Sequence, residues 1–163
     1  TRSSLDLRKQ NILQAGTIAQ SYDNKIWVFD EVENKLKKMD EDGSLLLETT
    51  DLRLLLGLSV MPVKIFDENK LIYLYDPLLG IYVFDYYGTI KNSIMINGWQ
   101  NLKVTGNYIF GSKADTLYRY EINTFRYDEW ILPKQIFQSK AFNFTVTRLY
   151  ALKNESIEIY SLH

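Results

Sequence analysis

The side chains that most often perform catalysis are scarce in this chain. Its 163 residues include no cysteine and one histidine, His163, which is the last residue. Chain ends usually fray, so we interpret His163 as a disordered terminus rather than a general base. Without cysteine or a second histidine, this sequence cannot form a Ser-His-Asp or Cys-His arrangement, or a metal site of imidazole and thiolate ligands. No glycine-rich phosphate loop is present either. We therefore expect no catalytic residue, no metal site and no cofactor.

Carboxylates offer one further candidate, for a calcium or glycosidase site, in the run Asp40-Glu41-Asp42-Gly43. This run lacks the alternating oxygen ligands and the distal Glu of an EF-hand loop. A second turn of the same kind, Asp85-Tyr86-Tyr87-Gly88, has aromatic residues at its middle positions. What the two turns share is an Asp that can cap a turn and a Gly that tolerates positive φ. We therefore interpret both as structural turns.

Aromatic residues are abundant, with twelve Tyr, eight Phe and three Trp, and their flat faces could stack on a sugar. Five of them lie at alternating positions within predicted strands and are expected in the core: Trp27, Tyr73, Tyr75, Tyr82 and Phe84. Tyr86 and Tyr87 at a hairpin tip, and Trp99 in the connection Asn97-Gly98-Trp99-Gln100, do not follow strand alternation. Because exposed loop aromatics are favoured interface anchors, these three are our candidate partner contacts. Inward packing is the open alternative.

The strands that would position these residues form an internal repeat. Lys25-Ile-Trp-Val-Phe-Asp30 and Leu71-Ile-Tyr-Leu-Tyr-Asp76 are two versions of one aromatic strand, each with an Asn-Lys pair at or just before its start and an Asp-x-x-Gly turn after it. Weaker copies begin at Asn107 and Arg148. A repeat near 40 residues made of short strands is typical of propeller blades. The sequence therefore predicts an all-β fold, a β-propeller of four-stranded antiparallel blades, with about four blades in this chain.

The repeat divides the chain, taken as one domain of residues 1–163, into blades at about residues 8–50, 58–97, 98–133 and 134–163. The strand at residues 34–40 has lysines among apolar residues, which predicts one wet face and a place toward the rim. Residues 49–57, with an N-cap candidate and a closing Gly57, predict a helical turn between blades.

The two ends of the pattern are incomplete. The fourth copy lacks an outermost strand, and residues 3–7 are predicted to form a lone outer strand. That strand either completes the fourth blade and closes a four-bladed ring, or finishes a blade that lies upstream. In an open arc, the large apolar side chains of a terminal blade would be exposed to water, which costs roughly 1.5 to 3 kcal/mol for each side chain. An open arc would therefore need a partner that covers them.

Charge and hydropathy exclude two classes of partner. Nineteen basic and twenty acidic residues give a net charge of −1, and no segment concentrates one sign. We therefore expect no nucleic-acid binding. No apolar run approaches the roughly 20 residues of a membrane-spanning helix, so no transmembrane segment is predicted. Because the chain starts at Thr1 rather than Met, we expect an upstream segment, which could carry a lipid anchor for membrane attachment.

The order of these motifs resembles a group of β-propeller proteins from the cell envelope of Bacteroidota, secreted proteins or lipoproteins without assigned function. The resemblance covers most of the chain and is carried by these stretches: Ser21-Tyr22-Asp23-Asn24, Trp27-Val28-Phe29-Asp30, Leu71-Ile72-Tyr73-Leu74-Tyr75-Asp76-Pro77, Gly80-Ile81-Tyr82-Val83-Phe84-Asp85 with Gly88-Thr89, and Leu149-Tyr150-Ala151-Leu152 with Ile157-Glu158-Ile159-Tyr160. It implies a periplasmic or outer-membrane location in a Gram-negative bacterium. It also implies a lipoprotein-type leader and about two further blades upstream, so that the chain is the C-terminal part of a ring of about six.

Two functions of different classes follow from these observations. The preferred hypothesis is a non-enzymatic propeller scaffold that mediates protein–protein interaction in the bacterial cell envelope, with a protein partner whose identity the sequence does not give. The alternative is a carbohydrate- or small-ligand-binding propeller, conceivably hydrolytic, with its site at the central channel. A purely structural role in a larger assembly is a third reading.

Overall fold

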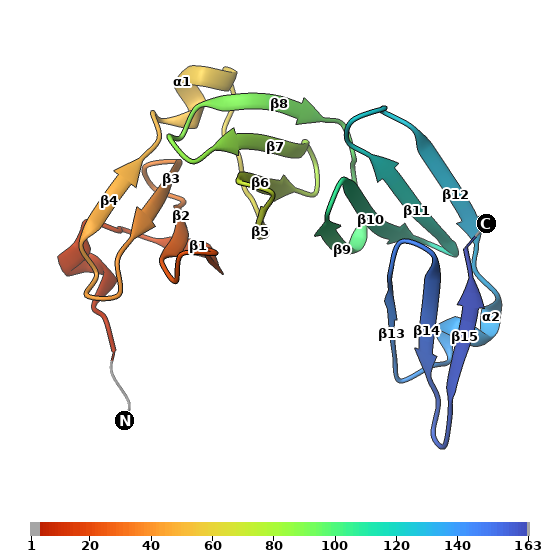
Figure 1. The fold of residues 1–163 in the computed structure, drawn as a ribbon. Helices are drawn as coiled ribbons and strands as arrows, with labels where there is room; N and C mark the ends of the chain where they lie inside the picture. Colours follow the sequence, from red (N-terminus) through yellow and green to blue (C-terminus); the bar gives the residue numbers. More distant parts are fainter. Residues whose placement is uncertain (1–3, 163) are drawn as a thin grey trace. The chain divides into compact units, whose positions relative to one another are not determined.

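The computed structural model describes residues 4–162 and is built almost wholly of antiparallel strands (Figure 1). Residues up to Gly98 belong to one compact unit and residues from Trp99 onward to a second, and each unit is described by itself. His163 lies outside the described residues.

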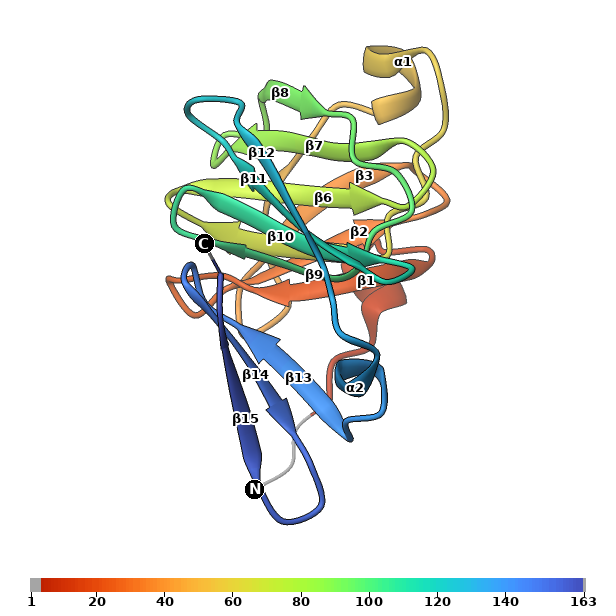
Figure 2. The same cartoon turned by 90° about the vertical axis from the view of Figure 1, so that its right-hand side faces the viewer.

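The first unit contains two four-stranded sheets, each with its strands in sequence order. The strands of the first sheet are β1 (Ala15–Gln20), β2 (Ile26–Asp30), β3 (Lys35–Met39) and β4 (Leu45–Glu48). Those of the second are β5 (Lys64–Glu68), β6 (Leu71–Asp76), β7 (Gly80–Asp85) and β8 (Ile90–Ile94). Figure 2 shows β6, β7 and β8 as successive strands of the second sheet.

The second unit contains a four-stranded and a three-stranded sheet. The four strands are β9 (Gln100–Thr105), β10 (Tyr108–Lys113), β11 (Thr116–Glu121) and β12 (Tyr127–Ile131). The last sheet has β13 (Ala141–Phe144), β14 (Arg148–Leu152) and β15 (Ile157–Ser161). Four antiparallel meanders of four, four, four and three strands confirm the all-β prediction and fit a partial propeller.

Strand alternation places one set of apolar residues of the first unit in a core that its two sheets share. The five aromatic residues expected in the core, Trp27, Tyr73, Tyr75, Tyr82 and Phe84, are all buried. Trp27 and Phe29 of β2 pack in one cluster with Ile72 and Leu74 of β6, so each sheet supplies the cover for its neighbour. Burial of such side chains contributes roughly 1.5 to 3 kcal/mol each.

The residues that recur around each second strand shape its two ends. Asn69 and Lys70 both have positive φ, at 52° and 62°, as a two-residue hairpin loop of type I′ requires, and Asn24 also has positive φ. At the other end, the Asp76 carboxylate is buried and accepts the backbone N–H groups of Leu78 and Leu79. The repeated residues therefore form the two turns at the ends of a buried strand.

Asp30, the equivalent of Asp76 in the first sheet, has Lys37 as an additional partner. This contact bears on the predicted wet face of the strand at residues 34–40. Lys37 of β3 is completely buried, and its ammonium group donates to Asp30 Oδ2 at 3.0 Å, to the Asn11 carbonyl at 2.6 Å and to Glu33. The prediction of a wet face on this strand is wrong, because these three oxygens satisfy the charge of the buried Lys37 ammonium group.

The helical turn predicted at residues 49–57 is confirmed as α1 (Leu52–Leu56), with Asp51 as N-cap and Gly57 as C-cap. A second short helix, α2 (Lys134–Phe137), precedes β13 and was not predicted. No helix among residues 4–162 is long and apolar enough to cross a membrane.

The lone outer strand predicted at residues 3–7 is wrong over its described part. Residues 4–6 belong to no strand, and Leu7 begins a 3₁₀ helix, η1 (Leu7–Gln10), whose N-cap Asp6 accepts the Arg8 N–H at 3.1 Å. Residue 3 lies outside the described residues. Leu7 packs with Ile12 against Val28 and Met39, so this segment covers a face of the first sheet.

Candidate functional site

Trp99, one of the three candidate contacts, packs inward. Its side chain is 6% exposed and stacks on Tyr118 with ring centroids 5.1 Å apart, and the Tyr127 ring lies 5.8 Å away. Gly111 makes room for the indole, since a Cβ at that position would lie 2.5 Å from it. Trp99 therefore serves the packing of the second unit, and the inward alternative holds for this residue.

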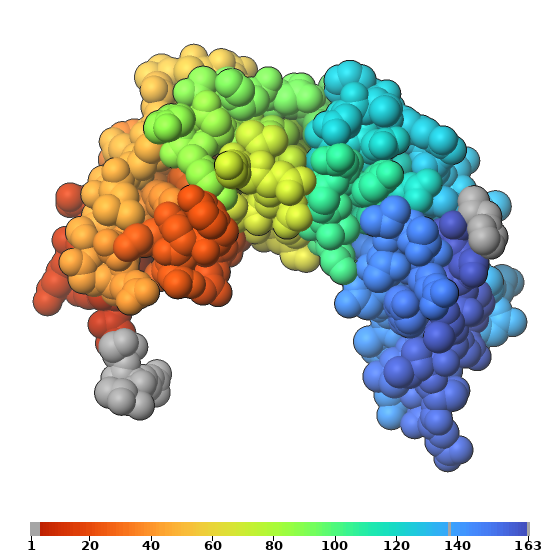
Figure 3. All heavy atoms as spheres, in the orientation of Figure 1, coloured from red at the N-terminus to blue at the C-terminus, as the bar shows by residue number. Residues whose placement is uncertain are grey.

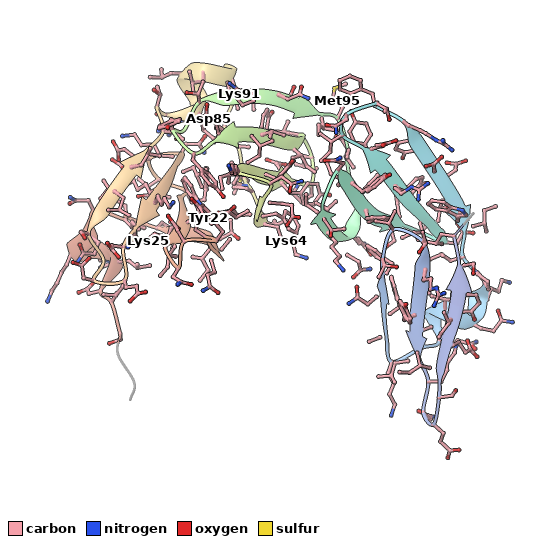
Figure 4. All side chains as sticks on the ribbon, in the orientation of Figure 1. Tyr22, Lys25, Lys64, Asp85, Lys91 and Met95 are labelled. Carbon is pink, nitrogen blue, oxygen red and sulfur yellow. The ribbon has the colours of Figure 1, made fainter. Side chains whose placement is uncertain are left out.

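Tyr86 lies in the turn between β7 and β8, and its ring stacks on a tyrosine from the first sheet. The rings of Tyr22 and Tyr86 are nearly parallel, at 4°, with centroids 5.3 Å apart. Tyr22 lies in the β1–β2 loop, where Figure 4 labels it between the first and second sheets. Tyr86 itself is partly buried, whereas Tyr22 is 70% exposed.

Asp67 of β5 fixes the position of Tyr86. The Tyr86 hydroxyl donates to Asp67 Oδ1, and Asp67 Oδ2 accepts from the Ser21 hydroxyl at 2.7 Å and from Trp27 Nε1 at 3.2 Å. Burial raises the pKa of the Tyr86 phenol well above its ordinary value, and the Asp67 carboxylate beside it raises that pKa further. Tyr86 is therefore a neutral donor in this contact.

Lys38 places a positive charge among the same rings. Its ammonium group lies 5.2 Å from the Trp27 ring centroid, 5.1 Å from that of Tyr86 and 6.0 Å from that of Tyr22. Asp23 accepts from it at 2.7 Å. Although partial burial raises the pKa of the Asp23 carboxyl, the hydrogen bonds from Lys38, Ser21 and the Lys25 N–H, together with the Lys38 charge, lower that pKa overall. Cation–π contacts of this kind contribute about 0.5 to 2 kcal/mol.

Tyr87, the residue after Tyr86, is a further exposed aromatic residue in the same turn. It is 85% exposed at the tip of the turn, and Asp85 holds that turn by accepting the backbone N–H groups of Tyr87 and Thr89 at 2.9 and 3.0 Å. Gly88 has φ of 79°, as the Asp-x-x-Gly pattern predicts. We call Tyr22, Tyr86 and Tyr87 the tyrosine cluster.

The turn that carries Tyr86 and Tyr87 is braced by the first sheet. A Cβ at Gly88 would lie 3.2 Å from Thr49 and 3.3 Å from Leu47 of β4. Figure 3 shows this turn, in green, against the orange surface of the first sheet. The tyrosine cluster is therefore built by both sheets of the first unit, on a support that packs closely.

Tyr22 was missed as a candidate contact by the sequence reasoning. The signal that selected Tyr86 and Tyr87, an aromatic residue in a loop between strands, also applies to the Ser21-Tyr22-Asp23-Asn24 stretch. What the sequence could not give is the stacking of Tyr22 on Tyr86, because the two lie on different sheets.

The acidic run at residues 40–43 behaves as a turn. Asp40 accepts from Lys25 Nζ at 2.6 Å, and Asp42 accepts the Ser44 N–H at 2.9 Å. Gly43 has φ of 90°, matching Gly88 in the equivalent turn. Within the described part of the chain, no group of three or more His, Cys, Asp or Glu residues is placed to hold a metal ion.

Comparison with known proteins shows the fold. No protein-family model and no curated protein matches the chain. Among solved structures, virginiamycin B lyase from Staphylococcus aureus is 13% identical, with a TM-score of 0.57 over 91% of this chain and 55% of the lyase. The WD40 domain of Neurospora crassa Pan2 is 13% identical, with a TM-score of 0.54 over 90% of this chain and 46% of that domain.

A third similar structure, the computationally designed Ika4 protein, is 13% identical, with a TM-score of 0.53 over 92% of both chains. The chain thus spans about half the length of the lyase and of the WD40 domain. At these identities the likeness shows a β-propeller-like fold alone. It does not carry the activity of any of these proteins to this chain.

Proposed function

We propose that this chain is a β-propeller scaffold, without catalysis of its own, that binds a protein partner through the tyrosine cluster. The observation that carries the proposal is the exposed ring of Tyr22, stacked on a Tyr86 that is held in place by Asp67, with the exposed Tyr87 as the next residue in the same turn. WD40-type propellers are often used in protein interaction, which supports the assignment.

The physical argument rests on preorganisation. Tyrosine presents a large contact area at low cost in conformational entropy, and interfaces are enriched in such anchors. Here the stack of Tyr22 on Tyr86 and the ammonium group of Lys38 restrict the rings before a partner arrives. A partner that covers the Tyr22–Tyr86 stack therefore loses little free energy to ordering these two rings.

The cell envelope is the compartment that we propose for this interaction. The support is the resemblance of the motifs to envelope propellers of Bacteroidota, and a chain without cysteine is compatible with an oxidising periplasm. A fractionation with compartment markers tests this part separately from the binding surface.

Affinity capture with matched variants tests the binding surface. The full chain, the Tyr22→Ala/Tyr87→Ala variant and a Leu78→Ala/Met95→Ala control are each incubated with native envelope and cytosolic fractions. Leu78 and Met95 are as exposed as Tyr87 but lie at the opposite end of β7 and β8. We expect one envelope protein to be retained by the wild type and the control, with at least a tenfold loss for the tyrosine variant.

Retention of the same proteins by all three forms, or by none of them, would contradict the proposal. The flat exposed rings of Tyr22 and Tyr87 also favour carbohydrate stacking as a second candidate. A thermal-shift screen with oligosaccharides separates the two, because a ligand that binds only the folded state raises the melting temperature. A sugar-dependent shift that disappears in the tyrosine variant would favour carbohydrate.

A further inference from the structure

The first sheet contains a buried lysine, Lys37, that its turn does not require. Asp30 and Asp76 are equivalent residues, and each holds the turn after the second strand of its sheet by accepting backbone N–H groups. Lys37 lies two residues after the ladder partner of Asp30, and Tyr82 lies two residues after the ladder partner of Asp76. Because the second sheet builds the same turn with a tyrosine at this place, the lysine of the first sheet has no part in forming it.

Lys37 contacts two carboxylates in a place that is closed to solvent. The side chains of Lys37 and Asp30 are 1% and 0% exposed, and Lys37 Nζ lies 3.0 Å from Asp30 Oδ2. Glu33, whose side chain is 36% exposed, accepts from the same nitrogen. The Asn11 carbonyl accepts from it as well, at 2.6 Å. A nitrogen that becomes a nucleophile when deprotonated, an acyl carbon and a carboxylate that can carry a proton therefore lie together.

The second oxygen of Asp30 lies among backbone N–H groups. Asp30 Oδ1 accepts from Val32 at 3.1 Å and from Gln14 and Glu33 at 3.4 Å. Fixed N–H groups around such an oxygen stabilise the negative charge that develops on it when a nucleophile adds to the carboxyl carbon. The surroundings of Asp30 therefore suit acyl transfer as well as turn formation.

We infer that Lys37 and Asp30 condense to an amide, so that an isopeptide bond joins β3 to the last residue of β2. Glu33 takes a proton from Lys37 Nζ, the neutral amine adds to Asp30 Cγ, and the Nζ–Cγ bond forms while the Cγ–Oδ2 bond breaks. Of the three protons on the ammonium group, one stays on the amide nitrogen. The other two leave with Oδ2 as water, carried by Glu33, which ends as a carboxylate again. The step needs no oxidant or reductant.

Proximity and burial favour this condensation. Burial lowers the pKa of Lys37, but the hydrogen bonds and charges of Glu33 and Asp30 raise it by more, so the reaction begins with a proton transfer to Glu33. Two buried charges carry a desolvation cost that a neutral amide does not. Well-oriented groups in contact reach effective molarities of about 10⁵ to 10⁸ M. An ion pair that is held in this way is therefore poised to lose water.

The surroundings also fit the amide product. Its nitrogen keeps one N–H, which can donate to the Asn11 carbonyl as the ammonium group does. Its oxygen is Asp30 Oδ1, which keeps its three backbone donors. The Leu13 N–H, which donates to Oδ2 at 2.9 Å, is the group that has to find a new acceptor. These contacts all lie in the first sheet and its N-terminal segment, so the inference stands independently of the tyrosine cluster.

The intact mass of the folded full chain tests the inference. We expect the wild type to be lighter than its sequence mass by one water molecule, and a digest to contain one peptide in which Lys37 is joined to Asp30. Lys37→Met should keep its full mass. Lys35→Met, which removes a partly exposed partner of Glu48 from the same strand, is the control and should lose water as the wild type does. A folded wild type that keeps its full mass after long incubation at neutral pH, or water loss that persists in Lys37→Met, would overturn the inference.

Two further comparisons test why this pair reacts. Glu33→Gln removes the proton carrier at a partly exposed side chain, and it should lose water at least tenfold more slowly than the wild type after a pulse of cell-free synthesis. Lys38 and Asp23 are 2.7 Å apart in the same sheet, but their side chains are 11% and 32% exposed, and they should stay unlinked. Circular dichroism checks that each variant is folded. Equal rates for Glu33→Gln and wild type, or linkage of Lys38 to Asp23 to the same extent, would contradict the proposed reaction.

Discussion

At the scale of single residues, the burial of the Lys37 ammonium group is a feature that the sequence did not predict. Lys37 alternates with apolar neighbours on β3 and therefore reads as a solvent-facing residue. Inside the sheet it meets Asp30, Glu33 and the Asn11 carbonyl, which come from other parts of the chain. A buried ammonium group is tolerated only when such partners are present. The sequence of β3 alone does not indicate that these partners will surround Lys37.

Trp99 and Tyr86 also show that contacts distant in sequence decide where a side chain lies. Both lie in connections where no strand alternation demands an aromatic residue, yet Trp99 turns inward onto Tyr118 while Tyr86 joins an exposed stack. The difference lies in contacts that are distant in sequence: Gly111 admits the Trp99 ring, and Asp67 binds the Tyr86 hydroxyl. Loop position alone therefore identified a group of candidates without ranking them.

The Tyr86–Asp67 contact leads to a prediction for Tyr86→Phe. The substitution keeps the ring that stacks on Tyr22 and removes the hydroxyl that donates to a carboxylate. We expect a loss of about 1.5 to 3 kcal/mol in the free energy of unfolding, as for a hydrogen bond to a charged group. Urea titration followed by tryptophan fluorescence measures it.

The control is Tyr87→Phe, at a side chain that is 85% exposed in the same turn. It should change the free energy of unfolding by less than about 0.5 kcal/mol. Equal effects of the two substitutions would mean that Asp67 does not hold Tyr86.

At the scale of strands and turns, the sequence was most informative where backbone conformation demands particular residues. Gly43 and Gly88, which close the two predicted Asp-x-x-Gly turns, both have positive φ. η1 and α2 were not predicted, since each is only four residues long and leaves no clear periodicity. Leu5 and Leu7 alternate like strand residues, but Leu7 begins η1 and packs on the first sheet.

Gly80, the first residue of β7, provides a test of turn chemistry. Its φ is 107°, and a Cβ there would lie 2.3 Å from the carbonyl oxygen of Ile94 in β8. Neither strain can be relieved by rotating a side chain. We expect Gly80→Ala to destabilise the fold by at least about 3 kcal/mol, the sum of backbone strain and a displaced β7–β8 ladder.

Gly57→Ala is the matched control, because Gly57 has φ of 71° but open space around its Cα. It should lose only about 1 to 2 kcal/mol, the cost of the left-handed conformation itself. Thermal unfolding of the two variants in parallel makes the comparison. A Gly80→Ala variant no less stable than Gly57→Ala would show that the close approach of β8 has no energetic weight.

At the scale of the whole molecule, a propeller fold leaves function open. Unrelated activities share one architecture, so the likeness to a lyase and to a WD40 domain does not choose between catalysis and binding. Our proposal rests on what the chain presents, an exposed tyrosine cluster held by two sheets. This cluster favours a contact surface for a protein partner.

Site-specific photocrosslinking in native cells tests that claim most directly. A benzophenone amino acid replaces Tyr22, Tyr87 or, as the control, Leu78, which is equally exposed at the opposite end of β7. The account predicts that positions 22 and 87 crosslink to the same single protein and that position 78 does not. Absence of a crosslink from positions 22 and 87, or the same products from all three positions, would contradict it.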